Sequence, residues 1–305
     1  MTGARREIRE IALLTNPAAG HGKALAAARR ARERFAERGV QVRELVGADA
    51  EASGRLAREA VADGVDALVV VGGDGMVHLA LPAVCGSATA LGVIPAGTGN
   101  DQARAYGWPR KKPEQAADVV ADGHTRRVDV GQVVTADGRT QLFGSVLASG
   151  FDSLVSDRTN RMRWPHGRAR YNLAMLAEFA NLRPLPFRIT TADGTVIERE
   201  LLLVAVGNTS SYGGGMRICP DADPSDGMLD VTVIDAATRR SVLRRTPSVY
   251  RGTHTRNPEV EVLRTTELHI ESAGINAYAD GECLGPLPAR VSVLPGTVTM
   301  LVAGQ

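Results

Sequence analysis

The residues best suited to chemistry lie in a glycine-rich turn, Gly72-Gly73-Asp74-Gly75. It follows Ala67 to Val71, an apolar run without alternation that predicts a strand buried on both faces. Glycines leave backbone amides open to a ligand, and such a turn before a helix is where phosphates bind. A carboxylate beside phosphates needs a shared cation such as Mg²⁺. Because Asp-Gly is also a common turn, this motif alone leaves a nucleotide site and a plain turn equally open.

Two more turns of this kind follow predicted strands. One runs from Asn16 to Gly22 after the strand 11–15, and the other runs from Pro95 to Asp101 after the strand 91–94. Helices are predicted between these units, over about 23–38, 52–63 and up to 84. Alternating strands and helices indicate a parallel sheet. The turns then share the edge of an open α/β sheet at which ligands bind.

The pattern changes after about Asp129. Short alternating runs with hairpin signals, such as Asp193-Gly194, predict a mostly antiparallel β domain. One helix is predicted within it, over Arg170 to Asn181, from apolar residues near helical spacing. The length of 305 residues fits two domains that each bury a core.

The composition excludes several classes of protein. The net charge of +2 predicts neither nucleic-acid nor membrane binding by charge alone. The three cysteines are far apart, which predicts no disulfide framework or zinc site and fits a reducing cytosol. The charged N-terminus does not resemble a signal peptide, and no apolar run approaches the length of a membrane span. A soluble protein is expected.

The glycine-bearing turns, with two later segments, resemble the diacylglycerol kinase catalytic-domain family over nearly the whole chain. Residues 149–154 and 211–215 look closest to actinobacterial members of that family. The resemblance implies an N-terminal doubly wound α/β nucleotide-binding domain over 1–130, with a last strand at about 296–305 returning to it. It also implies a C-terminal antiparallel β-sandwich lipid domain over 131–295, with ATP in the cleft between the two domains. The five segments that carry the resemblance, in order, are Asn16-Pro17 to Gly20, Gly72–Gly75, Pro95–Asp101, Asp226–Asp230 and Asp280–Glu282.

The resemblance also implies how ATP is held. The chain has no Walker-type Gly-Lys-Ser/Thr, so backbone amides and Mg²⁺ must neutralise the phosphates. Asp74, Asp101 and Asp129 match positions that hold the catalytic Mg²⁺ through water. A helix N-cap is the alternative role for Asp101, and an arginine pair is the alternative for Asp129. The residues expected around the nucleotide are Asn16, Gly20, Gly72, Gly73, Asp74, Gly75, Met76, Thr98, Asp101 and Glu282.

By the same resemblance, Asp280 is the expected catalytic base, which accepts the proton of a lipid hydroxyl as it attacks the γ-phosphate. Asp74 is the second candidate, and a plain hairpin turn is the alternative reading of Asp280-Gly281. A second, structural Mg²⁺ is expected at Asp226 with the backbone carbonyls of Asp223 and Met228. A polar turn is the alternative there.

The sequence departs from the family at two positions. Met76 stands where a threonine is common, which removes a hydroxyl contact to phosphate. His21 stands where a lysine or arginine is common, with Lys23 two residues on, and the sequence does not decide whether either reaches phosphate.

The predicted function is a lipid kinase that transfers the γ-phosphate of ATP to diacylglycerol, giving phosphatidic acid. Other readings are a kinase for a sphingoid base or another glycerolipid, an NAD-kinase-like enzyme, or an inactive lipid-binding homologue, which only Met76 suggests. Hydrolysis is not predicted, because no nucleophile–base set appears. The oligomeric state stays open, a homodimer included.

The segment Arg158 to Arg170, with five arginines and Trp164, predicts contact with anionic lipid headgroups. A solvated charged loop is the alternative. Together with the lipid substrate, this segment predicts a cytoplasmic protein bound peripherally to the inner face of the membrane.

Overall fold

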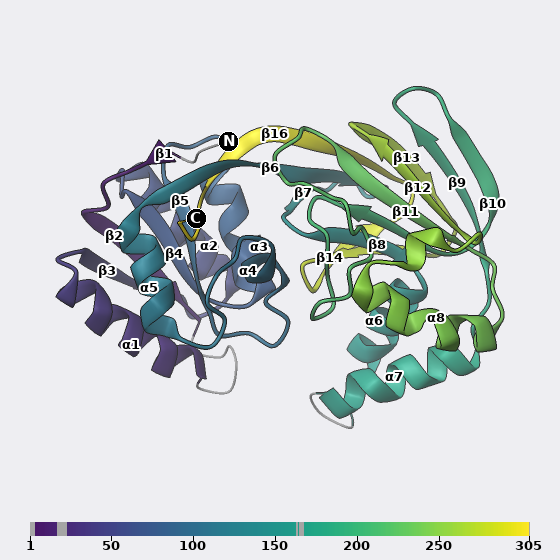
Figure 1. Cartoon of the computed structure of the whole chain (residues 1–305), viewed down its shortest axis with the longest axis horizontal. Coiled ribbons are helices and arrows are strands. Elements are labelled where there is room, and N and C mark those ends of the chain that lie inside the picture. The colour runs from purple at the N-terminus through teal and green to yellow at the C-terminus, as the bar shows by residue number, and fades with distance from the viewer. Residues whose placement is uncertain (1–3, 17–22, 163, 165–167, 305) are drawn as a thin grey trace.

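The computed structural model describes residues 4–16, 23–162, 164 and 168–304. The helices and strands form two groups that lie side by side, an α/β lobe and a mostly β lobe (Figure 1). The first group and the strand that leaves it are β1 (Ala4–Arg5), β2 (Glu10–Thr15), α1 (Lys23–Glu37), β3 (Gln41–Val46), α2 (Ala50–Ala62), β4 (Ala67–Gly72), α3 (Asp74–Val84), β5 (Ala90–Pro95), α4 (Asp101–Ala105), α5 (Pro113–Asp122) and β6 (His124–Thr135).

The second group contains the antiparallel strands and three helices. Its elements are β7 (Thr140–Phe143), β8 (Val146–Gly150), α6 (Phe151–Arg161), α7 (Arg168–Ala180), β9 (Leu185–Thr191), β10 (Val196–Gly207), β11 (Leu229–Asp235), α8 (Arg239–Arg251), η2 (His254–Arg256), β12 (Val260–Thr265), β13 (Glu267–Glu271), β14 (Asn276–Ala279), β15 (Glu282–Pro286) and β16 (Ala289–Leu301).

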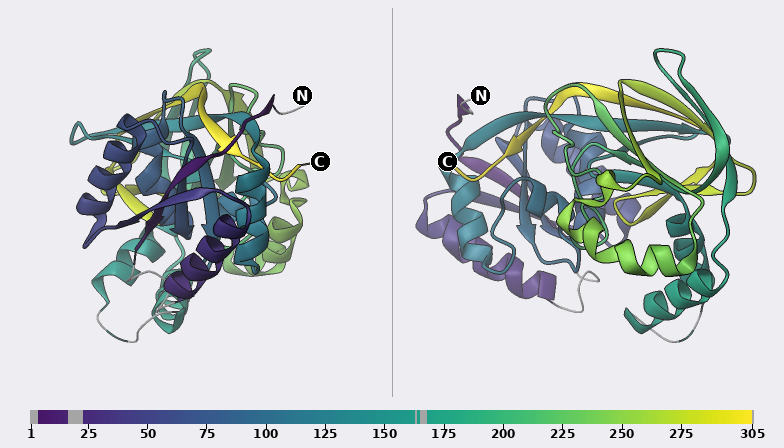
Figure 2. Two further views of the ribbon diagram at one scale, coloured as in Figure 1. Left: turned by 90° about the vertical axis from the view of Figure 1, so that its left-hand side faces the viewer. Right: turned by 45° about the vertical axis from the view of Figure 1, so that its right-hand side comes forward.

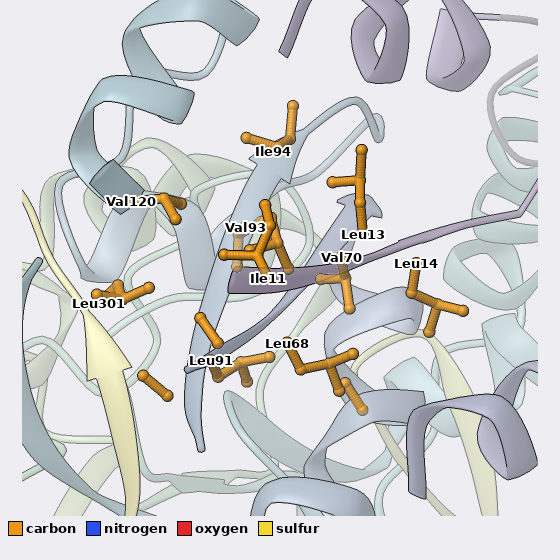
Figure 3. Close-up of a cluster of buried hydrophobic side chains, with 14 of the residues drawn as sticks. Ile11, Leu13, Leu14, Leu68, Val70, Leu91, Val93, Ile94, Val120 and Leu301 are labelled. Carbon is orange, nitrogen blue, oxygen red and sulfur yellow. The ribbon is translucent and has the colours of Figure 1, made fainter. Parts of the chain in front are cut away.

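The α/β lobe is built on a parallel sheet in the order β3-β2-β4-β5. All six residues of β4 and of β5 are buried, which explains why their sequences are apolar without alternation. Ile11, Leu68 and Ile94 are among the side chains that fill the core, and Leu301 of β16 lies beside the same cluster (Figure 3). The predicted parallel α/β fold is confirmed.

The β lobe has its own core between antiparallel strands. Strand β10 pairs with β8, β9 and β11, and β13 pairs with β9 and β16. Strand β9 alternates buried and exposed residues, as one face of a sandwich-like sheet requires. Phe143, Phe187 and Leu201 are fully buried in this second core. The predicted antiparallel β-sandwich class is confirmed.

Two long strands, β6 and β16, run between the lobes (Figures 1 and 2). They pair with each other antiparallel, interrupted between Leu294 and Val298. Beyond the interruption, Thr299 and Met300 pair in parallel with β5 of the α/β lobe. The domain boundaries expected at 130/131 and 295/296 therefore fall inside these two strands.

Two helices of the β lobe do not follow from the sequence pattern, which predicted only one helix there. Helix α8 has no buried residue, and Pro247 weakens its helical signal, although Val242, Leu243, Val249 and Tyr250 recur at helical spacing. Helix α6 buries only Ser153 and Val155. The prediction of a single helix was wrong because these helices rest on the lobe with little core contact.

Candidate active site

Two glycine turns meet at the carboxyl edge of the parallel sheet. Gly72 of β4 and Pro95 of β5 are register partners, so the turns after them lie together. A Cβ on Gly97 would lie 2.8 Å from Oδ1 of Asn100 and closer still to the Cα of Gly73. Asn100, at φ 53°, holds this turn, since its Oδ1 accepts from the Gly97 amide at 3.0 Å and its Nδ2 donates to the Gly97 carbonyl at 2.9 Å. Backbone contact therefore excludes any side chain at Gly97.

Asp74 and Asp101 come from these two turns and face each other. The Cβ position of Gly99 would lie 3.0 Å from Oδ2 of Asp74 and 3.2 Å from Oδ2 of Asp101. Burial raises the pKa of the Asp74 carboxyl, and the negative charges of Asp101 and Asp280 raise it further against the hydrogen bonds that oppose them. Asp74 also accepts a hydrogen bond from the Gln102 amide at 2.9 Å, which fixes its direction.

Asp101 is the first residue of α4, and Asn100 rather than Asp101 takes the N-cap position. Its carboxylate pairs with Arg104 and accepts from the Gly214 amide at 2.7 Å. Gly214 belongs to the loop after β10. Asp101 therefore links the carboxyl edge of the parallel sheet to the β lobe.

Asp280 stands between β14 and β15, on the opposite wall. It has φ 55°, which aspartate tolerates better than most residues. Its side chain is fully buried, and it accepts from the Gly144 amide at 2.8 Å, the Ser145 amide at 3.0 Å and the Ser145 hydroxyl. These donors fix the orientation of the carboxylate at the wall of the cleft.

His78 is a site residue that the sequence analysis missed. It lies one helical turn after Asp74 on α3, and its Nδ1 is 3.5 Å from Oδ2 of Asp280. Burial lowers the pKa of His78, but the nearby carboxylate of Asp280, with the charge of Glu282, raises it net above its ordinary value. The spacing of four residues from Asp74 was the signal that the sequence offered.

The two walls enclose a cleft of about 320 Å³. Glu282 closes one side, because its Oε1 lies 3.4 Å from the Cβ position of Gly75. The two glycine turns line one wall and the β lobe lines the other. The lining residues are Gly73, Asp74, Gly75, Thr98, Gly99, Asp101, Ser145, Val146, Ala148, Asp152, Ser156, Tyr171, Tyr212, Gly213, Tyr278, Ala279, Asp280 and Gly281.

The other predicted nucleotide residues fall in three places. Thr98 is exposed and lines the cleft, and Asn16 follows β2 at the same sheet edge. The Met76 side chain is buried against Gly72, and its amide donates to the Gly73 carbonyl, so Met76 faces the core and not the cleft. Gly20 and His21 lie outside the described residues, and Lys23 begins α1 beside a separate hollow with Arg30 and Lys111.

Asp129 is not at the cleft wall. Its two carboxylate oxygens accept from the amides of Gly227 at 2.7 Å and Gly296 at 2.6 Å. No arginine in the described part of the chain forms an ion pair with Asp129, which was the alternative role for this residue. Asp129 ties together β6, the loop before β11 and the interruption in β16.

The residues expected at the second metal carry other partners. Asp226 pairs with Arg264 and accepts from the Met228 amide at 3.0 Å. The carboxylate of Asp223 accepts from Arg126 at 2.6 Å and from the Ser225 hydroxyl at 2.8 Å. The described residues contain no group of three His, Cys, Asp or Glu side chains able to hold a metal. The one carboxylate of the expected set is thus already neutralised by an arginine.

Comparisons with known proteins agree with this arrangement. Residues 10–133 match the diacylglycerol kinase catalytic domain, and residues 144–302 match the YegS C-terminal NAD kinase beta sandwich-like domain. A diacylglycerol kinase of Mycobacterium tuberculosis is 50% identical over 97% of this chain and 96% of its own length. A diacylglycerol kinase of Bacillus subtilis is 30% identical over 77% of each chain. A crystal structure of a Bacillus anthracis protein assigned to the same activity superposes with a TM-score of 0.82 at 25% identity, covering 98% of this chain and 97% of that one.

The two matched family models and these relatives place this two-lobed chain among the ATP-dependent lipid kinases. The chain is a member of the diacylglycerol kinase family. The predicted family, fold class and enzyme class are confirmed.

Proposed function

We propose that the protein transfers the γ-phosphate of ATP to the free hydroxyl of diacylglycerol, giving phosphatidic acid. The observation that carries this proposal is the meeting of two walls, with Glu282 and Asp280 of the β lobe facing Gly75 and Asp74 of the α/β lobe. Phosphoryl transfer needs positioning and charge neutralisation more than covalent chemistry. A cleft with phosphate-binding amides on one side and an oriented carboxylate on the other supplies both.

The first helix amides of α3 supply phosphate contacts. Asp74 and Gly75 open this helix, and the first N–H groups of a helix have no acceptor within it. They point toward the edge shared with Thr98 and Gly99, where the helix dipole also favours an anion.

Mg²⁺ fits the same place. The carboxylates of Asp74 and Asp101 lie close together and repel each other. Mg²⁺ is commonly held by one or two carboxylates together with substrate phosphates. When bound there, the ion would neutralise the phosphate charge. The second, structural Mg²⁺ at Asp226 has weaker support, since Arg264 pairs with the one side-chain carboxylate expected there, whereas Asp74 has no arginine partner in the described residues although Asp101 pairs with Arg104.

For the base we propose Asp280, with Asp74 as the second candidate. Asp280 is held in one orientation by three donors from residues 144 and 145, as a group that must meet a hydroxyl in line with ATP should be. Burial raises the pKa of the Asp74 carboxyl, which makes it a better proton acceptor than an ordinary aspartate. Because Asp74 lies in one of the glycine turns, it suits the role of a metal ligand better than that of the base.

The experiment compares Asp280→Asn, Asp74→Asn and Ser145→Ala in the transfer of labelled phosphate from ATP to diacylglycerol in mixed micelles. We expect Asp280→Asn to lower kcat by roughly 10²- to 10⁴-fold, the usual worth of a general base. Ser145→Ala removes one donor to Asp280 and keeps the base, so it should lower kcat far less. Thermal unfolding of each variant checks the fold.

Two outcomes would contradict parts of this proposal. Nearly full turnover in Asp280→Asn with loss in Asp74→Asn would make Asp74 the base. Phosphate transfer to NAD and none to diacylglycerol would overturn the lipid acceptor itself.

We propose that helices α7 and α8 dock the protein on an anionic membrane. Leu176 of α7 is 64% exposed, Leu243 of α8 is 67% exposed and Trp164 is 76% exposed. Helix α8 adds Arg239, Arg240 and Arg244 at or near its start. Figure 1 places α6, α7 and α8 on the same side of the β lobe. Aromatic and aliphatic side chains mixed with arginine suit a bilayer surface.

The docking proposal concerns the surface of the molecule. None of the helices in the described ranges has the length and apolarity to cross a bilayer. We propose that the protein lies in the cytoplasm and binds the inner face of the membrane through this surface. Tyr171 of α7 also lines the cleft, so this surface adjoins the acceptor side of the site.

Co-sedimentation with phosphatidylglycerol vesicles tests the docking. The double change Trp164→Ala and Leu176→Ala should lower vesicle binding at least tenfold. It removes two apolar side chains whose burial in the bilayer would stabilise the bound state. Leu25→Ala on α1, a similarly exposed leucine of the other lobe, is the matched control and should bind normally. Equal binding by the double variant would rule this surface out.

A further inference from the structure

The β-lobe wall of the cleft carries a carboxyl group that the phosphate chemistry does not use. Asp152 lies in the first turn of α6 and lines the cleft with Ser156, one turn further along the same helix. Gly150 fixes this placement, since it has φ 111° and a Cβ there would lie 2.5 Å from the Leu202 carbonyl oxygen. The chain therefore turns directly from β8 into α6 and presents Asp152 to the cleft.

Asp152 differs from the other carboxylates of the cleft in its partners. Asp101 pairs with Arg104, and Asp280 is held by backbone amides. Asp152 accepts a hydrogen bond from the Tyr212 hydroxyl, and no Arg, Lys or His in the described ranges forms an ion pair with it. Burial raises the pKa of Asp152 to about 7. Burial therefore favours the protonated form of Asp152 in this site.

The groups around Asp152 are otherwise neutral. Tyr171 of α7 lines the cleft together with Asp152. Burial and the charge of Asp152 raise the pKa of Tyr171 to about 12. Tyr212 comes from the loop after β10, and Ser156 comes from α6 itself. The cleft lining that α6, α7 and this loop supply in the described residues contains no charged side chain other than Asp152, and Tyr278 of β14 adds a further hydroxyl.

The loop that carries Tyr212 also reaches the phosphate edge. Two residues beyond Tyr212, the Gly214 amide donates to Asp101 at 2.7 Å, and Arg104 donates to the Gly214 carbonyl at 3.3 Å. Asp152 is therefore tied through one short loop to the place where the phosphate is expected. A lipid headgroup that offers its hydroxyl to Asp280 would lie along this wall.

We infer that Asp152 is a specificity-determining residue that, as a carboxylic acid, donates a hydrogen bond to an ester carbonyl of the acceptor lipid. This inference rests on the proposed function. The Tyr212 hydroxyl already donates to Asp152, so beside the hydroxyls of Ser156 and Tyr171 the proton of Asp152 is the donor whose presence depends on pH, and an ester only accepts. An ionised Asp152 would repel the carbonyl and would instead suit the ammonium group of a sphingoid base.

The test measures KM for a short-chain diacylglycerol in mixed micelles from pH 6 to 8.5. In the wild type we expect KM to rise about tenfold or more, since an acid with a pKa near 7 is mostly ionised at the upper limit. Asp152→Asn keeps a donor at every pH, so its KM should stay flat. The change should appear in KM more than in kcat, because Asp152 binds the headgroup and not the reacting atoms.

A dialkylglycerol, which has ether oxygens and no carbonyl, gives an independent readout on the wild-type protein. Its KM should show little of the pH dependence seen with the diester. An equal rise in KM for both lipids, or the same rise in Asp152→Asn, would overturn the role of Asp152. Absence of any lipid phosphorylation would instead contradict the proposed function, so the two failures are distinguishable.

Discussion

At the scale of single residues, the Asp280-Gly281 pair shows how a turn and a chemical group coincide. Asp280 at φ 55° and Gly281 at φ 90° form the tight connection between β14 and β15 that the residue types suggest. The same Asp280 carboxylate is buried and held by Gly144 and Ser145. Local sequence predicts the turn, but the donors lie about 135 residues earlier and only the fold brings them together.

Met76 shows the reverse case. The sequence analysis treated it as a lost phosphate contact, whereas its side chain packs over Gly72 in the core of the α/β lobe. The amides of Asp74 and Gly75 do not depend on it. Met76 is thus no argument for an inactive protein.

Gly97→Ala tests how closely the two phosphate turns must approach. The added Cβ would lie 2.8 Å from Oδ1 of Asn100 and closer to the Gly73 backbone, so one turn must move. We expect KM for ATP to rise at least tenfold, as displacement of a binding group by about 1 Å commonly costs more than that. Steady-state kinetics over a range of ATP concentrations measures it.

Gly54→Ala on α2 is the matched control, because its Cβ would meet only Arg58 at 3.5 Å and alanine favours a helix. It should leave KM for ATP unchanged. An unaltered KM for ATP in Gly97→Ala would show that the turns are not rigidly packed against each other.

At the scale of elements, sequence periodicity predicts what packs into a core and misses what does not. The predicted buried strands of the α/β lobe appear as β2, β4 and β5, and the alternating runs of the second half appear as β9 and β10. Helices α6 and α8 bury few or no apolar residues, and the apolar residues that recur along α8 stay outside the core. These exposed helices are the ones that bring Asp152 and the proposed membrane surface to the cleft.

At the scale of the whole molecule, β6 and β16 make the lobes parts of one sheet system. The change of sequence pattern near residue 130 marks the boundary between the two lobes. Strand β6 continues through that boundary, and nothing in the local sequence indicates this. The family resemblance implied the returning strand, which the residues alone did not show. The pairing of β16 with both β6 and β5 joins the two lobes through one strand.

Asp129 holds this junction, and Asp129→Ala tests its contribution to stability. Its loss would leave the Gly227 and Gly296 amides without acceptors, and each unsatisfied partly buried donor costs about 1–3 kcal/mol. We expect the free energy of unfolding to fall by roughly 2–4 kcal/mol, measured by urea denaturation. Asp193→Ala, which removes an exposed turn carboxylate that accepts from the Thr195 amide, should have a smaller effect. Equal stability of the two variants would show that Asp129 does not hold the lobes together, because its buried bonds would then contribute no more than those of a surface turn.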